Sequence, residues 1–120
     1  MEYEVKLYEK VDGKMPVLDF IVSLNPKQQA KIYREIELLK KFGNELHLPH
    51  VRKIEGEKYN VLWELRIEVA SNAFRIFYFM HYQNHSVLLH GFQKKTIKTP
   101  PKELDIALNR MKDYIARKEK

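Results

Sequence analysis

Residues 61–92 read VLWELRIEVASNAFRIFYFMHYQNHSVLLHGF and contain three short stretches rich in β-branched and aromatic residues. Apolar and polar residues alternate along the first two stretches, and the third is a short apolar run, which together predict strands over about 61–69, 73–80 and 86–92. Only a few residues separate these stretches, as is typical of hairpins. We therefore expect three antiparallel strands that are neighbours in one meander sheet.

The register of the first hairpin decides which side chains share a face of this sheet. An even-length loop pairs the apolar positions of the two strands and places Arg75 beside Arg66. An odd loop would turn Arg75 into the core, where an unpaired charge is strongly unfavourable, so we expect the even loop. The apolar positions that it pairs are Trp63, Leu65, Ile67 and Val69 with Phe74, Ile76, Tyr78 and Met80.

The second hairpin, around residues 81–85, extends the same argument to the third strand. Unbroken alternation places Val87 and Leu89 on the core side, and we expect the helices to cover that side. The opposite face would then remain open. The side chains expected on the open face are Arg66, Arg75, Phe77, Phe79, Leu88, His90 and Phe92.

The N-terminal half predicts a first strand and two helices. Alternation over residues 3–7 indicates the strand, residues 16–24 could form a short helix, and residues 51–54 are a possible edge strand. The second helix is expected over 26–42, because Asn25 precedes a first-turn proline and a glycine follows residue 42. Its apolar stripe is Ile32, Ile36 and Leu39.

The third strand leads into a cationic junction, because residues 87–101 read VLLHGFQKKTIKTPP. Lys94 and Lys95 follow the strand directly, and Thr99 places a capping hydroxyl before a first-turn proline. The last helix carries one apolar stripe. The stripe is Leu104, Leu108, Met111 and Ile115. Helices first, then a meander sheet and a closing helix predict a compact α+β fold.

Length and composition predict one domain over residues 1–120, since the chain is 44% hydrophobic. The net charge is +6, and residues 94–120 hold nine Lys or Arg against four Asp or Glu. This clustering suits a phosphate-binding surface or an acidic partner, and equally a solvated basic helix. The absence of cysteine excludes thiolate chemistry. No signal peptide or apolar stretch of about 20 residues is present, so we expect a cytoplasmic protein without membrane contact.

The groups on the expected open face are those needed to bind and cleave single-stranded RNA without a metal. Attack of a 2′-hydroxyl on phosphorus needs fixed positive charge and groups that transfer protons. The catalytic candidates are Arg66, Arg75, Lys94, Lys95 and His90, and the RNA-binding candidates are Phe77, Phe92 and Lys98.

Each candidate also has a structural interpretation. Arg66 lies between Glu64 and Glu68 on one face, so a cross-strand ion pair competes with an RNA contact. His90 alone is more often a hydrogen-bonded sheet residue than a catalyst, and the phenylalanines could simply pack beneath another segment. His47 and His50 lack further ligands, so neither a metal nor another cofactor is expected.

Three segments together resemble the HigB-type, phage-derived branch of the RelE/ParE toxin superfamily: LWELRI at 62–67, FRIFYF at 74–79 and LLHGFQKKTIKTPPKELDIA at 88–107. The resemblance implies a RelE-like fold and a type II toxin, an endoribonuclease that cuts mRNA, usually on the ribosome. It also implies a HigA-like helix-turn-helix antitoxin as partner.

By this resemblance Arg75 matches the transition-state arginine, Arg66 the arginine of the L-W-E-L-R segment, and Lys94 and Lys95 the basic positions after the last strand. Many RelE-like toxins have a tyrosine or histidine where this chain has Gln93, Lys94 and Lys95, which leaves the general acid open. On this interpretation Arg75→Ala should leave folding intact and abolish translation arrest. The alternatives are a non-catalytic, ParE-like inhibitor of DNA gyrase and an inactive antitoxin-binding protein.

Overall fold

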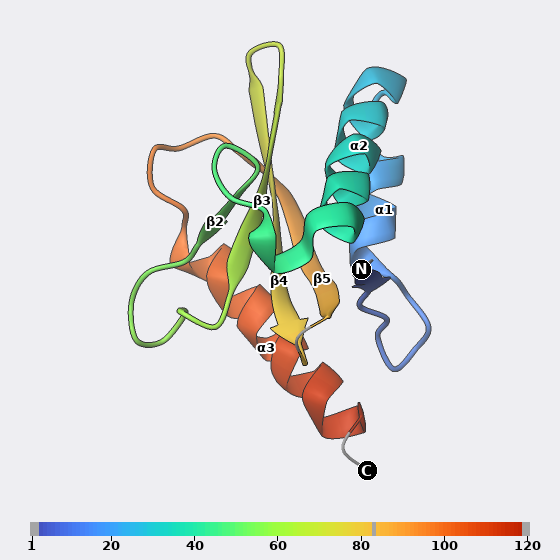
Figure 1. Cartoon of the computed structure of the whole chain (residues 1–120), viewed down its shortest axis with the longest axis vertical. Coiled ribbons are helices and arrows are strands. Elements are labelled where there is room, and N and C mark those ends of the chain that lie inside the picture. The colour runs from blue at the N-terminus through green and yellow to red at the C-terminus, as the bar shows by residue number, and fades with distance from the viewer. Residues whose placement is uncertain (1–2, 83, 119–120) are drawn as a thin grey trace.

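A computed structural model describes residues 3–82 and 84–118, which form an α+β structure with a central sheet. Helices α1 and α2 lie on one side of the sheet and α3 lies on the other (Figure 1). The elements are β1 Glu4–Leu7, α1 Pro16–Val22, α2 Pro26–Phe42, a 3-10 turn η1 Gly43–Glu45, β2 Val51–Lys53, β3 Trp63–Val69, β4 Asn72–His81, β5 His85–Lys94 and α3 Pro101–Lys118.

The sheet is mixed, and its strand order over the described residues is β1-β5-β4-β3-β2. Strands β3, β4 and β5 form the expected antiparallel meander, β2 adds to it by pairing antiparallel with β3, and β1 pairs in parallel with β5. The predicted fold class is therefore confirmed. The sequence argument did not predict where β1 would pair.

Helix α2 begins and ends where its capping residues predict. The Asn25 side chain accepts a bond from the backbone N–H of Gln28, and the Gln28 side chain accepts one from the Asn25 N–H, which completes a capping box. The helix ends at Gly43, whose φ of 51° lies in the left-handed region. A Cβ at this glycine would collide with the Tyr3 ring, so the stop also lets the chain approach β1 closely.

The first hairpin has the even register that charge burial predicted. Val69 pairs with Asn72 across a two-residue loop, and Arg66 pairs with Arg75. The apolar positions of the two strands consequently face α1 and α2. The fully or nearly fully buried residues of this core include Val17, Ile21, Ile32, Leu39, Leu65, Ile67, Phe74, Ile76 and Tyr78.

The second hairpin departs from the expected alternation because of a β-bulge. Phe77 pairs with His90 but Tyr78 pairs with Leu88, so Leu89 is an extra residue in β5. Because of the bulge, the β5 residues that precede it lie on the faces opposite to those expected from unbroken alternation. Leu88 packs in the α1/α2 core and Val87 and Leu89 pack on the α3 side, whereas the opposite was expected for all three residues.

The expectation of an open, ring-lined sheet face is also wrong. Helix α3 covers that face, and Phe77, Phe79 and Phe92 are 0%, 5% and 8% exposed. An amphipathic helix must place its apolar stripe against another apolar surface. The three phenylalanine rings, together with Val87 and Leu89, provide that surface for α3. The helical residues of this second core are Leu104, Ala107, Leu108, Met111 and Tyr114.

Candidate functional site

The sheet register brings charged residues together on the side of the sheet that faces α3. Arg52 of β2 pairs with Glu64 of β3, and Arg66 of β3 pairs with Arg75 of β4. Directly paired residues of an antiparallel sheet project from the same face, with Cβ atoms about 5 Å apart. Lys94 is the last residue of β5 and lines the same place, and the loop that follows β5 adds Ile97 and Thr99 (Figure 1).

These residues surround a hollow of about 200 Å³, which we call the cationic pocket. Lys94 is held at its wall, because its Nζ donates a hydrogen bond of 2.7 Å to the carbonyl oxygen of Ile97. Four cations and two carboxylates contribute to the wall, so the pocket favours an anion. The lining residues are Arg52, Lys53, Ile54, Glu55, Glu64, Arg66, Lys94, Ile97 and Thr99.

Arg66 is both ion-paired and accessible. Its Nη1 donates a 2.8 Å hydrogen bond to Glu64 Oε2, two residues earlier in β3, so the ion pair that competes with an RNA contact lies within one strand and not across two. The side chain nevertheless remains 25% exposed and lines the cationic pocket. A guanidinium has five N–H donors, so one bond to Glu64 orients the group and leaves donors for a ligand.

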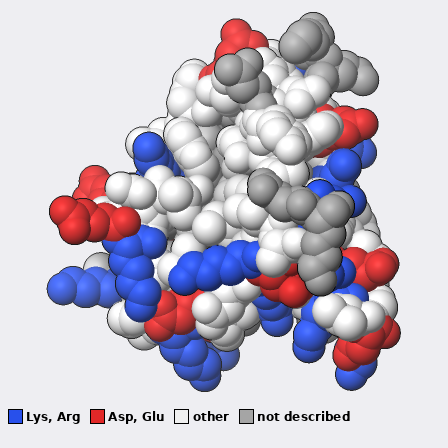
Figure 2. Space-filling model, turned by 90° about the horizontal axis from the view of Figure 1, so that it is seen from below, with Lys and Arg blue, Asp and Glu red and all other residues white. Residues whose placement is uncertain are grey.

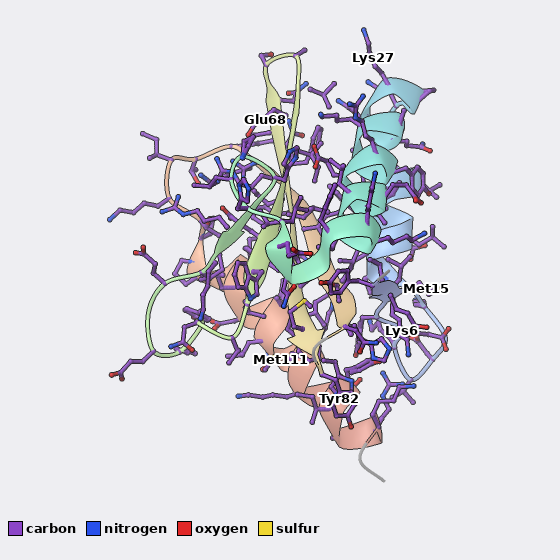
Figure 3. All side chains as sticks on the ribbon, in the orientation of Figure 1. Lys6, Met15, Lys27, Glu68, Tyr82 and Met111 are labelled. Carbon is purple, nitrogen blue, oxygen red and sulfur yellow. The ribbon has the colours of Figure 1, made fainter. Side chains whose placement is uncertain are left out.

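Arg75 is only 4% exposed and is not among the residues that line the pocket. Its Nη1 donates to the Phe74 carbonyl at 2.9 Å and to Glu68 Oε1 at 3.1 Å, and its Nε lies 3.8 Å from Glu64 Oε1. Figure 3 shows Glu68 near the end of the molecule that the β3–β4 hairpin forms, whereas Tyr82, in the β4–β5 hairpin, lies near the opposite end. The expectation that the Arg75 guanidinium is open to RNA is wrong, since the residue is buried and its guanidinium contacts two carboxylates.

Glu64 connects the two arginines, and the sequence argument missed this role. It is 5% exposed and contacts Arg66 through one carboxylate oxygen and Arg75 through the other. Arg52 and Lys53 were missed as well. The signal for them was the possible edge strand over 51–54, but its pairing with β3 was not predicted.

His90 lies in the seam between β5 and α3 and does not line the cationic pocket. Its Nε2 is 3.2 Å from Glu103 Oε1, its Nδ1 is 3.3 Å from Arg110 Nη1, and its ring stacks on Phe92 with centroids 5.7 Å apart. Burial lowers the pKa of His90 below its ordinary value of 6.5, against the opposing effect of the Glu103 carboxylate. These contacts secure the first turns of α3 against the sheet.

The lowered pKa predicts a pH-dependent contribution to stability. The neutral form of His90 is favoured in the folded state, so its stabilising effect is present above pH 6.5 and is lost as the pH falls through the folded-state pKa. We expect the wild-type protein to lose more stability than His90→Gln between about pH 8 and about pH 5 in urea unfolding. Equal losses in the two proteins would contradict this role, because the two proteins differ only at residue 90.

The remaining lysine candidates lie beside the cationic pocket. Lys95 lines a neighbouring hollow with Asn72 and Gln93, whose side chains are joined by a 3.0 Å hydrogen bond. Lys98 is exposed on the same loop. Lys94 lines both hollows. The structure thus brings together Arg66 and Lys94, places Lys95 and Lys98 nearby, and buries the rings of Phe77 and Phe92 away from solvent.

The basic C-terminal segment does not form a surface of one sign. Arg117 pairs with Asp113 at 2.8 Å, and Lys58 pairs with Asp105 at 3.1 Å. Figure 2 shows Lys and Arg interspersed with Asp and Glu on the face seen from below.

Among residues 3–82 and 84–118, none of the helices combines the length and apolar composition that a membrane span requires.

The fold and the cationic pocket define a small α+β protein with a pocket lined by cations at the rim of its sheet. Residues 19–112 match the family described as Phage derived protein Gp49-like (DUF891). Because the match covers well over half of the chain, the protein belongs to this family, which is part of the RelE/HigB-type toxin group. The comparison with curated proteins finds no matching sequence.

Proposed function

We propose that this protein is the toxin of a type II toxin–antitoxin system, a metal-independent endoribonuclease of the HigB type that cleaves mRNA on the ribosome and arrests translation. A HigA-like helix-turn-helix protein is the antitoxin that we expect to neutralise it. The observation that carries the proposal is the convergence of Arg52, Arg66 and Lys94 on one pocket. Membership of the RelE/HigB-type toxin group supports it.

The proposed reaction needs fixed positive charge more than any other feature. The ribose 2′-hydroxyl loses its proton and its oxygen attacks the adjacent phosphorus, and the bond to the 5′-oxygen breaks as that oxygen takes up a proton. Negative charge develops on the pentacoordinate phosphorane between these steps. Donors that are already oriented toward that charge lower the barrier most effectively. Arg66 and Lys94 are the proposed ligands of the scissile phosphate, because both line the pocket and both are held by hydrogen bonds.

The buried candidates have indirect roles in this proposal. Arg75 acts through Glu64, since its guanidinium fixes the carboxylate that in turn orients Arg66. His90 positions α3 through Glu103 and Arg110. Lys95 and Lys98 contribute charge beside the pocket for neighbouring phosphates. The buried rings of Phe77 and Phe92 pack against α3 and do not serve as stacking platforms.

Mapping of transcript 5′ ends after brief expression tests the proposed activity. New ends within coding sequence, absent from an Arg66→Ala strain, are the expected result. Intact transcripts together with DNA damage would instead identify a ParE-like inhibitor of gyrase. Intact transcripts without DNA damage, in a protein that still binds its antitoxin, would identify an inactive member of the family.

A lysine pair provides a matched test of the pocket. Lys94→Ala should slow RNA cleavage by about 100-fold, because it removes a donor from the wall of the pocket. Lys95→Ala removes the same charge one residue away but leaves the pocket intact, so its effect should stay below about tenfold. Cleavage rates of one reporter RNA at one salt concentration give the comparison. Equal effects of the two variants would show that net charge alone matters.

A further inference from the structure

A second hollow lies on the other side of strand β2, and the proposed chemistry does not use it. Its volume is about 470 Å³. Most of its wall is apolar, and its largest side chain is Trp63 of β3, which is only partly buried. The lining residues are Asn44, Glu45, Leu46, His47, Leu48, Val51, Arg52, Lys53 and Trp63.

This apolar hollow and the cationic pocket share two residues of the edge strand, Arg52 and Lys53. Arg52 pairs with Glu64 on the α3 side of the sheet, whereas Lys53 pairs with Trp63 on the opposite side. The Lys53 ammonium lies 5.9 Å from the Trp63 ring centroid, within the range of a cation–π contact. The three-residue strand β2 is thus a narrow ridge with a phosphate-sized cationic pocket on one side and an aromatic hollow on the other.

The chemistry of the shared wall indicates what occupies the hollow. Leu48 at its rim is 57% exposed, so apolar surface is available to a ligand. Arg52 and Lys53 are both exposed and favour an anionic ligand over a neutral apolar one. Single-stranded RNA combines both properties, because its phosphates bind cations and its bases stack on aromatic and apolar side chains.

We propose that the Trp63 hollow is a nucleobase subsite. An RNA strand crosses β2 with the scissile phosphate between Arg66 and Lys94, and a base of a neighbouring nucleotide enters the hollow beside Trp63. Lys53 then neutralises the phosphate that lies over the ridge. This inference rests on the proposed ribonuclease function and adds to it the place where the enzyme binds a base of its substrate.

Trp63 is the one tryptophan of the chain, so its intrinsic fluorescence reports on this hollow alone. The probe is a labelled single-stranded RNA whose 2′-hydroxyls are methylated, which removes the attacking group and prevents cleavage. We expect Trp63 fluorescence to change with the same midpoint as the anisotropy of the label. A strand of equal length with abasic sites should bind about tenfold more weakly, since a stacked base contributes that order of affinity.

Two exposed apolar residues provide a matched pair of variants. Leu48→Ser, at the rim of the hollow, should weaken binding of the intact strand but not of the abasic strand. Val22→Ser changes a similarly exposed residue, 64% against 57%, on α1 outside the hollow, and should leave both affinities unchanged. Both positions are at the surface, so neither substitution should compromise folding.

The outcomes separate this inference from the proposed function. Binding without a fluorescence change, with equal affinity for the intact and abasic strands, overturns the base subsite. Failure of the methylated strand to bind at all also overturns it. In either case the mapped transcript ends decide independently whether the protein is a ribonuclease. A fluorescence change produced by the antitoxin and not by RNA would assign the hollow to the protein partner instead.

Discussion

Replacement of Arg66 by alanine is expected to abolish growth arrest and to slow RNA cleavage by about 10²–10³-fold, the usual loss when one oriented transition-state donor is removed. Arg66 is the one strand arginine of the β3–β4 pair that reaches the cationic pocket, with a quarter of its side chain exposed, whereas its cross-strand neighbour Arg75 is buried. Cleavage of a reporter RNA by purified protein measures the effect directly.

Two further variants make this expectation specific. Arg66→Lys keeps the charge but lacks the planar guanidinium fork, so we expect partial recovery of cleavage. Arg34→Ala removes an exposed arginine from α2, on the other side of the sheet, and should cleave RNA like the wild type. Unfolding midpoints of all three proteins show whether the fold is intact. Unreduced cleavage by folded Arg66→Ala would refute the proposed site.

Arg75→Ala is expected to destabilise the protein by about 1–3 kcal/mol, because it removes one of the two cationic partners of the buried Glu64 carboxylate. The residue most affected is Glu64, because its side chain is 6% exposed and would retain only Arg66 as a cationic partner. Urea unfolding of the purified variant measures the loss. This result would differ from the expectation drawn from sequence, in which Arg75 was an exposed ligand and its removal left folding intact.

The partners of Arg75 supply the controls for this prediction. Glu68→Ala removes an exposed carboxylate, 59% accessible, and should cost less than about 1 kcal/mol. The double variant Arg75→Met/Glu64→Gln leaves no unpaired charge in the buried cluster and should recover part of the lost stability. A wild-type unfolding midpoint for Arg75→Ala would show that the buried ion pairs contribute little.

Local sequence patterns were sufficient for the elements and for the first hairpin. Strand and helix positions follow from periodicity and capping residues, as at Asn25 and Gly43. The even loop followed from the cost of burying a charge among apolar side chains, and it correctly placed Arg66 beside Arg75. The end of the apolar run before the paired lysines located Lys94 at the end of the last strand. These features depend on residues that are close in sequence or on a single hairpin.

Three other features were decided only by the tertiary structure. The bulge at Leu89 reverses the faces of β5 before it, and no periodicity of the strand alone shows it. Arg52 and Lys53 join the pocket because β2 pairs with β3 across the intervening loop. The parallel pairing of β1 with β5 joins segments about 80 residues apart.

The amino-acid sequence alone therefore determined which residues carry positive charge and which strand faces they occupy in the first hairpin. Only the tertiary structure decided which of those charges and rings meet solvent, because one amphipathic helix can cover either face of a sheet that is apolar on both. In the folded protein α3 covers Phe77 and Phe92, Glu64 and Glu68 pair with the buried Arg75, and Arg66 remains a quarter exposed. The environment of a charge is set by what packs over it, and that information lies outside its own strand.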